Sequence, residues 1–372
     1  MQALHLQILC FFVTGIITMT TMKASFSVTY FSKKHSQVQR FEAPIFYTLL
    51  MFVAESILMI SAKKKTKKGK NSNNPFEYVL VTETEKKAQK KQKKKFIFYT
   101  TAASCCDLLA STISGIAMVY VDATIMQLLR GSTIVFVAIG EQMYRKKLNL
   151  PSKTKKQAMS LLLSILGLSF VGVASVYTNA SGHTVVHAST TTQIVCIIAS
   201  ILGESLHAVQ SIVEALLLKD VEYPTEKVVG AEGISGTLVT LVFLIPVAQI
   251  FKSSPIGEDS FETFDALSQS MVLKLLCLAF AMGVLFLNYL GLLIMCKLSP
   301  MHRVLLDALR AFFLFLTNVI LHHFNPQYGE MICVYTIFEL LGFVMLLTST
   351  IAYNHYSNEA KKQEDDAALP LV

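Results

Sequence analysis

ATIMQLLRGSTIVFVAIGEQM, residues 123–143, and RVLLDALRAFFLFLTNVILHH, residues 303–323, decide the fold of this chain. Each stretch is apolar and long enough to cross ~30 Å of hydrocarbon as a helix, and each carries an internal arginine, Arg130 or Arg310. An arginine at the centre of a membrane helix costs at least about 2.5–3.5 kcal/mol on insertion scales. Two such arginines, 180 residues apart in a chain of 372, therefore indicate an internal repeat.

The composition is that of a membrane protein. The chain is 53% apolar and only 16% charged, whereas soluble proteins contain roughly 45–50% apolar and about 25% charged residues. A soluble multidomain enzyme is therefore excluded. The first apolar segment lacks a basic region before it, so we expect a retained helix and not a signal peptide. Ten apolar segments are predicted, at about residues 5–29, 43–61, 96–119, 123–143, 157–177, 190–218, 228–251, 271–296, 303–323 and 330–353.

The lysines and arginines predict the orientation, because cytosolic loops near membrane spans hold the excess of positive charge. With both termini in the cytosol, 25 of the 33 Lys and Arg fall on the cytosolic side and six on the other, while Arg130 and Arg310 lie within spans. This count places Arg303 in a cytosolic loop. The one N-x-S/T acceptor, at Asn179, falls in a loop on the non-cytosolic side and is a candidate glycosylation site.

The two arginine segments are the fourth and the ninth of the ten predicted spans, an offset of five, so the two halves enter the membrane in opposite directions. The predicted fold class is an all-α polytopic membrane protein, with ten transmembrane helices in two inverted five-helix repeats. The repeats cover residues 1–178 and 188–354. A disordered, Lys-rich cytosolic loop is expected at residues 62–95, and a cytosolic tail at residues 355–372.

Polar residues follow helical spacing in several of the predicted spans. Thr100, Ser104, Asp107, Ser111 and Ser114 form one stripe in the third span, with Asp107 at its centre. Ionisable residues in spans normally face the protein interior or a water-filled cavity. The candidate substrate- or ion-binding residues are Asp107, Gln127, Arg130, Glu204, His207, Gln210, Glu214, Glu232, Asp307 and Arg310.

Several of these residues have a purely structural alternative. Asp307 and Arg310 are three residues apart and can neutralise one another on their own helix. His207 can be a satisfied buried histidine near Glu204 instead of a proton carrier. Arg130 can be an interhelical ion-pair partner of Asp107 or Glu204.

The charges within the spans also bear on the substrate. Two arginines stand against seven acids, which favours a cationic or zwitterionic substrate with proton coupling, while a nucleotide sugar stays the alternative. No catalytic motif is present, and the cysteines form no CxxC pair, so we expect no enzyme, no cofactor and no metal site. The seven acids are Glu55, Asp107, Glu204, Glu214, Glu232, Asp307 and Glu339.

A further pattern, beyond composition and spacing, resembles a known family. Its residues are Ser104-Cys105-Cys106-Asp107, Met126 to Ser132, Glu214, Pro224, Gly230-Ala231-Glu232-Gly233 and Leu305 to Arg310. These residues are similar to the drug/metabolite transporter superfamily, and more narrowly to solute carrier family 35, subfamily F, among the nucleotide-sugar-transporter-like proteins. The resemblance covers nearly the whole chain apart from the lysine-rich loop and the tail.

The resemblance implies ten helices in two inverted halves, alternating access around a central cavity, and residence in an endomembrane such as the lysosome or Golgi. It names no substrate, because most of subfamily F lacks an assigned one. We therefore expect a secondary transporter of a small polar organic solute, with membrane lipids as further partners and a homodimer left open. Nucleic acid is not expected. A non-transporting membrane scaffold is the competing hypothesis.

Overall fold

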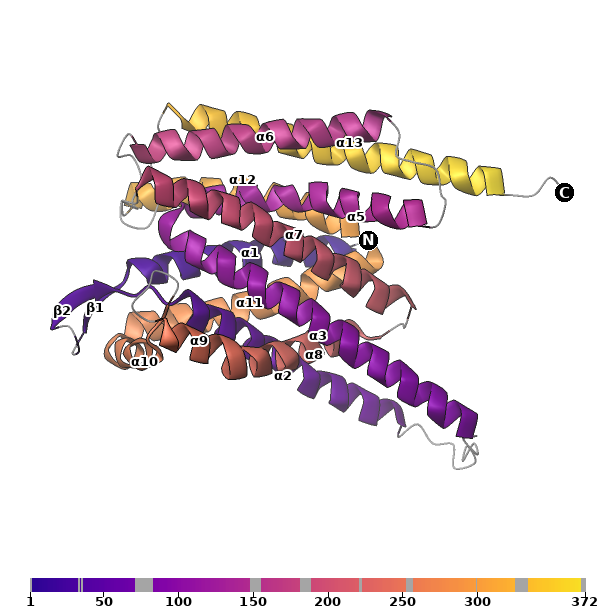
Figure 1. The fold of residues 1–372 in the computed structure, drawn as a ribbon, viewed down its shortest axis with the longest axis horizontal. Helices are drawn as coiled ribbons and strands as arrows, with labels where there is room; N and C mark the ends of the chain where they lie inside the picture. The colour runs from indigo at the N-terminus through magenta and orange to yellow at the C-terminus, as the bar shows by residue number, and fades with distance from the viewer. Residues whose placement is uncertain are drawn as a thin grey trace.

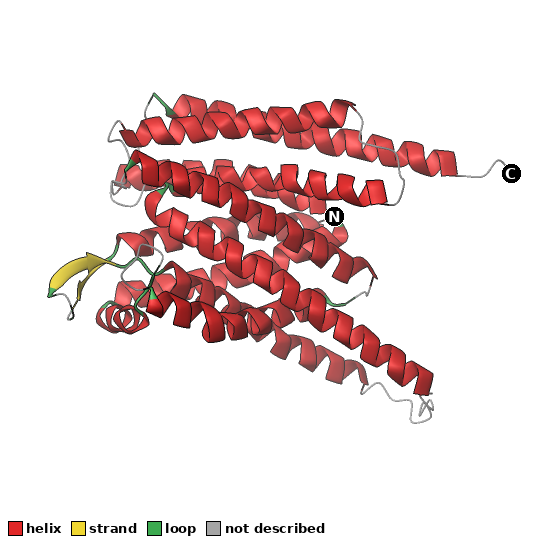
Figure 2. Ribbon diagram, viewed as in Figure 1, coloured by secondary structure: helices red, strands yellow, loops and turns green. Residues whose placement is uncertain are grey.

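The computed structural model describes residues 2–32, 34, 36–70, 83–147, 155–180, 189–220, 223–251, 257–298, 300–324 and 334–368. These residues are helical almost throughout, apart from one hairpin of two short strands (Figure 2). The helices are α1 (Gln2–Ser27), α2 (Pro44–Lys70), α3 (Glu83–Tyr120), α4 (Ala123–Leu129), α5 (Thr133–Lys147), α6 (Lys155–Ala180), α7 (Thr190–Asp220), α8 (Thr225–Val239), α9 (Ile245–Ile250), α10 (Ser260–Gln269), α11 (Met271–Lys297), α12 (Pro300–Phe324) and α13 (Thr336–Ala368).

Two helical turns of unusual geometry interrupt longer helices. A 3₁₀ turn, η1 (Arg130–Ser132), joins α4 to α5, and a π-helical turn, η2 (Thr240–Leu244), joins α8 to α9. Turns of both kinds inside α-helices are frequent at functional sites. The strands β1 (Thr29–Ser32) and β2 (Gln37–Arg40) pair antiparallel, with Thr29 opposite Arg40.

The predicted class of polytopic all-α membrane protein is confirmed. Within the described part of the chain, eight helical stretches are long and apolar enough to cross a membrane, and two shorter apolar helices lie at Pro44–Ile60 and Leu309–Phe324. These ten stretches coincide with the ten apolar segments predicted from the sequence. The count of ten spans and the inverted repeat stay predictions.

The helices pack as pairs that are distant in the sequence. The closest partners are α3 with α7, α6 with α13, α2 with α8, and α1 with α11. The start of α1 and the end of α13 lie at one end of the bundle, and the hairpin and α10 lie at the opposite end (Figure 1). We call that opposite end the hairpin end.

The expected disordered loop at residues 62–95 is wrong over most of its length. The structure continues α2 to Lys70 and begins α3 at Glu83, so both lysine-rich stretches are helical. Lysine, glutamine and glutamate are good helix formers, and extending an existing helix avoids the cost of nucleation. Residues 71–82 lie outside the described residues. The expected tail is helical as well, because α13 continues to Ala368.

Glycines on α8 let it pack directly against the backbone of α2. A Cβ atom added at Gly233 would lie 2.4 Å from the backbone nitrogen of Ser56, and one at Gly230 would lie 2.4 Å from that of Met59. Small residues at membrane-helix interfaces serve this close approach. The contact brings the backbone of Glu55, on α2, against Gly233 of α8.

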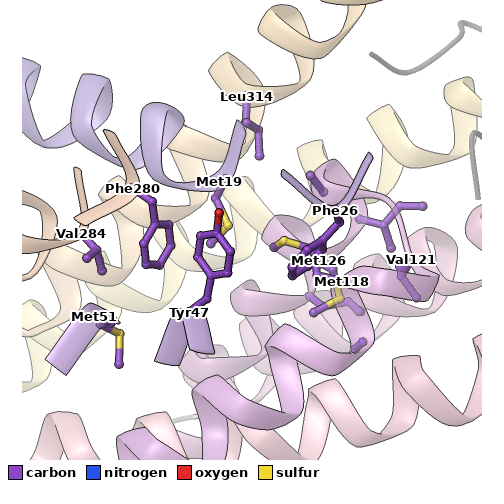
Figure 3. Packing of buried hydrophobic residues seen from close by; sticks show 14 of the residues in the cluster. Met19, Phe26, Tyr47, Met51, Met118, Val121, Met126, Phe280, Val284 and Leu314 are labelled. Atoms are coloured by element: carbon purple, nitrogen blue, oxygen red, sulfur yellow. The ribbon is translucent and has the colours of Figure 1, made fainter. Parts of the chain in front are cut away.

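Aromatic and methionine side chains pack together between the cavity-lining helices towards the hairpin end of the bundle. The rings of Tyr47 and Phe280 meet edge to face with centroids 4.6 Å apart, a favoured geometry for aromatic pairs. Met19 and Val284 surround this pair, and Phe26 lies close by (Figure 3). The cluster joins α1, α2 and α11.

A buried carboxylate holds the start of α2 at the hairpin end. Glu258 accepts backbone hydrogen bonds from Ile45 at 2.8 Å and from Phe46 at 3.2 Å, which are free N–H groups of the first helical turn. Thr263 donates a further hydrogen bond at 3.3 Å. Burial raises the pKa of Glu258 to about 7, although these hydrogen bonds act in the opposite direction.

The close contact between α2 and α8 generates the first prediction. Gly233→Ala forces the two backbones apart and is expected to destabilise the protein by about 1–3 kcal/mol, the usual cost of overpacking. The matched control is Gly172→Ala on α6, where nothing lies within 4 Å of the added Cβ. Thermal unfolding in detergent measures both variants, and equal midpoints would contradict the close packing.

The Glu258 carboxyl gives a prediction about pH. Its pKa is higher in the folded protein than in the unfolded chain, so its stabilising effect is complete below about pH 4.5 and is lost as the pH rises through about 7. The loss amounts to roughly 3 kcal/mol. Glu258→Gln should flatten the dependence of the unfolding midpoint on pH across this window, and an unchanged slope would disprove the assignment.

Candidate functional site

A cavity of about 140 Å³ lies in the middle of the bundle, between α1, α2, α3, α7, α11, α12 and the segment η1–α5. On its hairpin side the wall is formed by apolar side chains, among them Met19, Tyr47, Met51 and Phe280. The remaining wall is polar and charged. Six of the ten candidate residues from the sequence line it, namely Asp107, Arg130, Glu204, His207, Gln210 and Asp307.

One functional candidate was missed by the sequence analysis. Arg303 lines the cavity and lies on α12, so its assignment to a cytosolic loop is wrong. Its guanidinium donates to Glu214 on α7, with 3.1 Å between Nη1 and Oε2. The spacing of Arg303, Asp307 and Arg310 places all three on one helical face. This spacing could have identified Arg303 as a site residue from the sequence. It was counted as a loop residue because it falls at the boundary of an apolar segment.

Asp107 and His207 face one another across the cavity wall, from α3 and α7. The distance from His207 Nδ1 to Asp107 Oδ1 is 3.7 Å, an ion pair whenever the imidazole is protonated. Ser111 donates to the same Asp107 oxygen at 3.0 Å. The nearest acid to His207 is thus Asp107, and an ion pair with Glu204 is not among those of the described residues.

The polar side chains of α7 form a continuous chain of hydrogen bonds. His207 Nδ1 lies 3.1 Å from Gln210 Oε1, and Gln210 Nε2 donates to Glu214 at 2.8 Å. Because Glu214 also binds Arg303, the network runs from Asp107 on α3 to α12. These hydrogen bonds hold the side chains in fixed orientations relative to one another.

Arg130 lacks the ion pair that was considered for it. Glu204 accepts a hydrogen bond from Thr133 at 2.7 Å, and none of the ion pairs between described residues includes Arg130. The same holds for hydrogen bonds of its guanidinium within the described part of the chain. Arg130 begins the 3₁₀ turn η1 and lines the cavity. A cation facing a membrane cavity without a counter-ion favours an anionic group on a ligand.

Arg310 and Gln127 lie behind the cavity and not on its wall. Arg310 is 1% exposed, binds Asp307 at 2.9 Å and donates to Gln127 at 3.2 Å. A Cβ atom on Gly15 would overlap its side chain, and its guanidinium lies 5.4 Å from the ring of Phe11. The expected neutralisation of Asp307 by Arg310 is therefore present.

Two further acids lie deeper between α2 and α8. Glu232 is 6% exposed, and its Oε1 has no hydrogen-bond partner among the described residues. Glu55, on α2, accepts a hydrogen bond from Asn288, which lines the cavity from α11. Neither carboxylate lines the cavity. Of the remaining sequence candidates, Asn179 lies in the last turn of α6 and not in a loop.

The pairing leaves a small set of charges available to a ligand. Arg303 neutralises Glu214, and Arg310 neutralises Asp307. Asp107, Glu204 and Arg130 then remain on the cavity wall, with His207 able to add a positive charge. Charges of both signs on one wall suit a zwitterionic or polar ligand.

Comparison with known proteins places this arrangement in context. No family model matches the chain. Solute carrier family 35 member F6 of Rattus norvegicus is 26% identical over 255 residues, and the same protein of Homo sapiens is 24% identical over 255 residues. Both alignments cover 67% of this chain and 64% of the relative. The chain thus resembles solute carrier family 35, subfamily F.

The similarity covers only part of each protein. The chain covers 64% of the length of these curated relatives. An uncharacterized protein of Schizosaccharomyces pombe is 24% identical over 252 residues, with coverage of 67% of this chain and 71% of the relative. One crystal structure aligns with 93% of this chain at 13% identity and a TM-score of 0.46, which is too low for a conclusion.

We expect substitution of the two cavity arginines to affect the stability of the protein to very different extents. Arg303→Gln leaves Glu214 buried without a counter-ion, so we expect a loss of about 3–5 kcal/mol. Arg130→Gln removes no ion pair and no guanidinium hydrogen bond of the described residues, and should change stability by less than about 1 kcal/mol. Thermal unfolding in detergent compares the two variants.

A double variant supplies the control for this comparison. Arg303→Gln with Glu214→Gln removes both charges and should recover most of the lost stability, because no unpaired charge is left. If Arg303→Gln unfolds at the wild-type midpoint, the ion pair with Glu214 does not form in solution.

Proposed function

We propose that this protein is a secondary-active transporter that moves a small polar organic solute across a membrane by alternating access. The observation that carries the proposal is the central cavity, lined by Asp107, Glu204 and Arg130. Arg130 forms no ion pair with the other described residues. Ionisable residues inside a membrane bundle mark substrate and ion pathways. The relationship to proteins named solute carriers supports the same class.

The packing supports two inverted repeats of five helices. If the first-half helices α1, α2, α3, α4–α5 and α6 correspond in order to α7, α8–α9, α11, α12 and α13, the contact of α3 with α7 corresponds to that of α1 with α11. In the pairs α2–α8 and α6–α13, each helix then contacts its own counterpart in the other half. Gln127 and Asp307, which are 180 residues apart, touch at 3.2 Å, as equivalent positions do near a two-fold axis. The repeats are residues 1–178 and 188–354.

The cavity size favours a small solute over a nucleotide sugar. Sites for drug-sized ligands occupy roughly 300–1,000 Å³, whereas this cavity has about 140 Å³. A diphosphate would also need more free positive charge than Arg130 provides. We therefore propose a zwitterionic or polar solute, whose anionic group binds Arg130 and whose cationic or hydroxyl group binds Asp107 or Glu204.

The hairpin end is the closed gate in this conformation. The rings of Tyr47 and Phe280 line the cavity on that side and contact one another. Lys23 donates to the carbonyls of Met118 at 2.7 Å and Val121 at 2.9 Å, which joins α1 to the end of α3. By the distribution of lysine and arginine, we propose that this end faces away from the cytosol and that both termini are cytosolic. Residence in an endomembrane, lysosomal or Golgi, is part of the proposal and comes from the family resemblance.

Uptake by proteoliposomes tests the function. Vesicles carrying the wild type and an inside-alkaline pH gradient are offered a pooled metabolite extract, and the accumulated solutes are identified by mass spectrometry. Arg130→Gln and Asp107→Asn should each lower uptake of the transported solute about 10- to 100-fold, since a hydrogen bond to a charged group contributes about 1.5–3 kcal/mol.

The control is Glu359→Gln, an exposed residue near the end of α13, which should transport as the wild type does. Uptake that both cavity variants retain would remove the cavity from the transport path. If the folded wild type accumulates no solute, the membrane scaffold becomes the better hypothesis.

A further inference from the structure

Two buried carboxyl groups of the bundle form no ion pair with any cation of the described residues. Glu232 on α8 is 6% exposed and Glu55 on α2 is 2% exposed. None of the ion pairs between described residues includes either of them. Asn288 donates to Glu55, whereas Glu232 Oε1 is buried with no hydrogen-bond partner within the described part of the chain.

The surroundings of Glu232 are mostly acidic. It experiences repulsion from Glu55 of α2, Asp107 of α3 and Glu214 of α7, and attraction from Arg303 of α12. Arg303 is already bound to Glu214. Burying one unpaired carboxylate costs several kcal/mol, and burying two next to each other costs more. The negative charge of the Glu232 and Glu55 carboxylates must therefore be neutralised by a bound ion that is not part of the protein.

The geometry decides which ion this is. A metal cation needs several oxygen ligands at once, and among the described residues no group of three or more His, Cys, Asp or Glu side chains is placed to hold one. A proton needs only the carboxyl oxygen itself. Binding a proton leaves a neutral acid, which is the form that an apolar helix interface tolerates.

We propose that Glu232 and Glu55 form a proton-binding site between α2 and α8, separate from the solute cavity and joined to it through Asn288. The proton adds to a carboxylate oxygen and leaves from it again, with no other bond changed. Glu55 lies at the closest approach of the two helices, since a Cβ on Gly233 would be 2.7 Å from its Cβ. Loss of the proton places like charges at this contact and pushes α2 away from α8. The coupling of this site to solute movement rests on the proposed function, whereas the binding of a proton does not.

Infrared difference spectroscopy tests the site without any substrate. The full chain in liposomes is moved from acid to alkaline pH, and the C=O stretching band of protonated carboxyl groups is recorded in H₂O and D₂O. We expect the band to decrease as the pH rises in the wild type. Glu232→Gln should remove the signal of one carboxyl group per chain, and Glu55→Gln should remove or shift a second component.

The control Glu359→Gln, at an exposed carboxyl, should leave the band unchanged. Both test substitutions keep the size of the side chain and resemble the neutral acid, so we expect folded protein; Glu232→Asp, which keeps a titratable group, should retain a shifted band. A band identical to the wild type in Glu232→Gln, Glu55→Gln and the double variant would overturn the site.

Flux measurements separate this inference from the proposed function. With the solute found by uptake, the pH gradient should stimulate the wild type but not Glu232→Gln. Stimulation retained by Glu232→Gln would overturn the coupling role. A wild type that shows the infrared signal but moves no solute would count against the proposed function and leave the proton site standing.

Discussion

A charge inside a membrane bundle needs compensation, and this constraint organises the interior of the protein. Arg303 pairs with Glu214, Arg310 pairs with Asp307, Thr133 donates to Glu204 and Asn288 donates to Glu55. Each contact joins two helices except the pair within α12. Two exceptions are informative. Within the part of the chain that the structure describes, Arg130 at the cavity forms no ion pair, and Glu232 behind it has an oxygen without a hydrogen-bond partner. A group that the protein leaves unsatisfied is available to a ligand or an ion.

The second organising feature is the close approach of helices at glycines. Gly230 and Gly233 bring α8 onto the backbone of α2, and Gly15 makes room for the buried side chain of Arg310. In both cases the missing side chain serves a neighbouring ionisable residue, either by bringing Glu55 against α8 or by admitting the guanidinium. Packing and electrostatics are thus not separate in this protein, because the small residues decide which charged groups meet.

The fold class and much of the site followed from the sequence because apolar length and helical spacing are local properties. The stripe containing Asp107 and the arginine of residues 123–143 both reach the cavity. The position of Arg303 at the cavity could not be predicted from the sequence, because a positive residue at the boundary of an apolar segment can equally well belong to the adjoining loop. The prediction that the lysine-rich stretches are disordered was wrong for a related reason. A high charge predicts that a segment is solvated, but a solvated segment can still be helical. Which residues pair across helices depends on tertiary packing, so spacing could not show that Arg310 is behind the cavity and Arg130 is on it.

In the transport cycle that we propose, helix α2 links the parts of the molecule that must move together. It carries Tyr47 of the closed hairpin end and Glu55 of the carboxyl pair, eight residues apart, or about 12 Å along a helix. Its first turn is held by Glu258, and its middle rests on Gly233 of α8. A change of charge at Glu55 or Glu232 therefore acts on the same rigid element that closes the cavity with Tyr47. Because Tyr47 and Glu55 lie on one continuous helix, tilting of α2 away from α8 at the carboxyl pair would also shift Tyr47 against Phe280. The proposed gate at Tyr47 and the proposed proton site at Glu55 are then two contacts of the same helix. Movement of α2 would couple them directly, without a chain of intermediate residues.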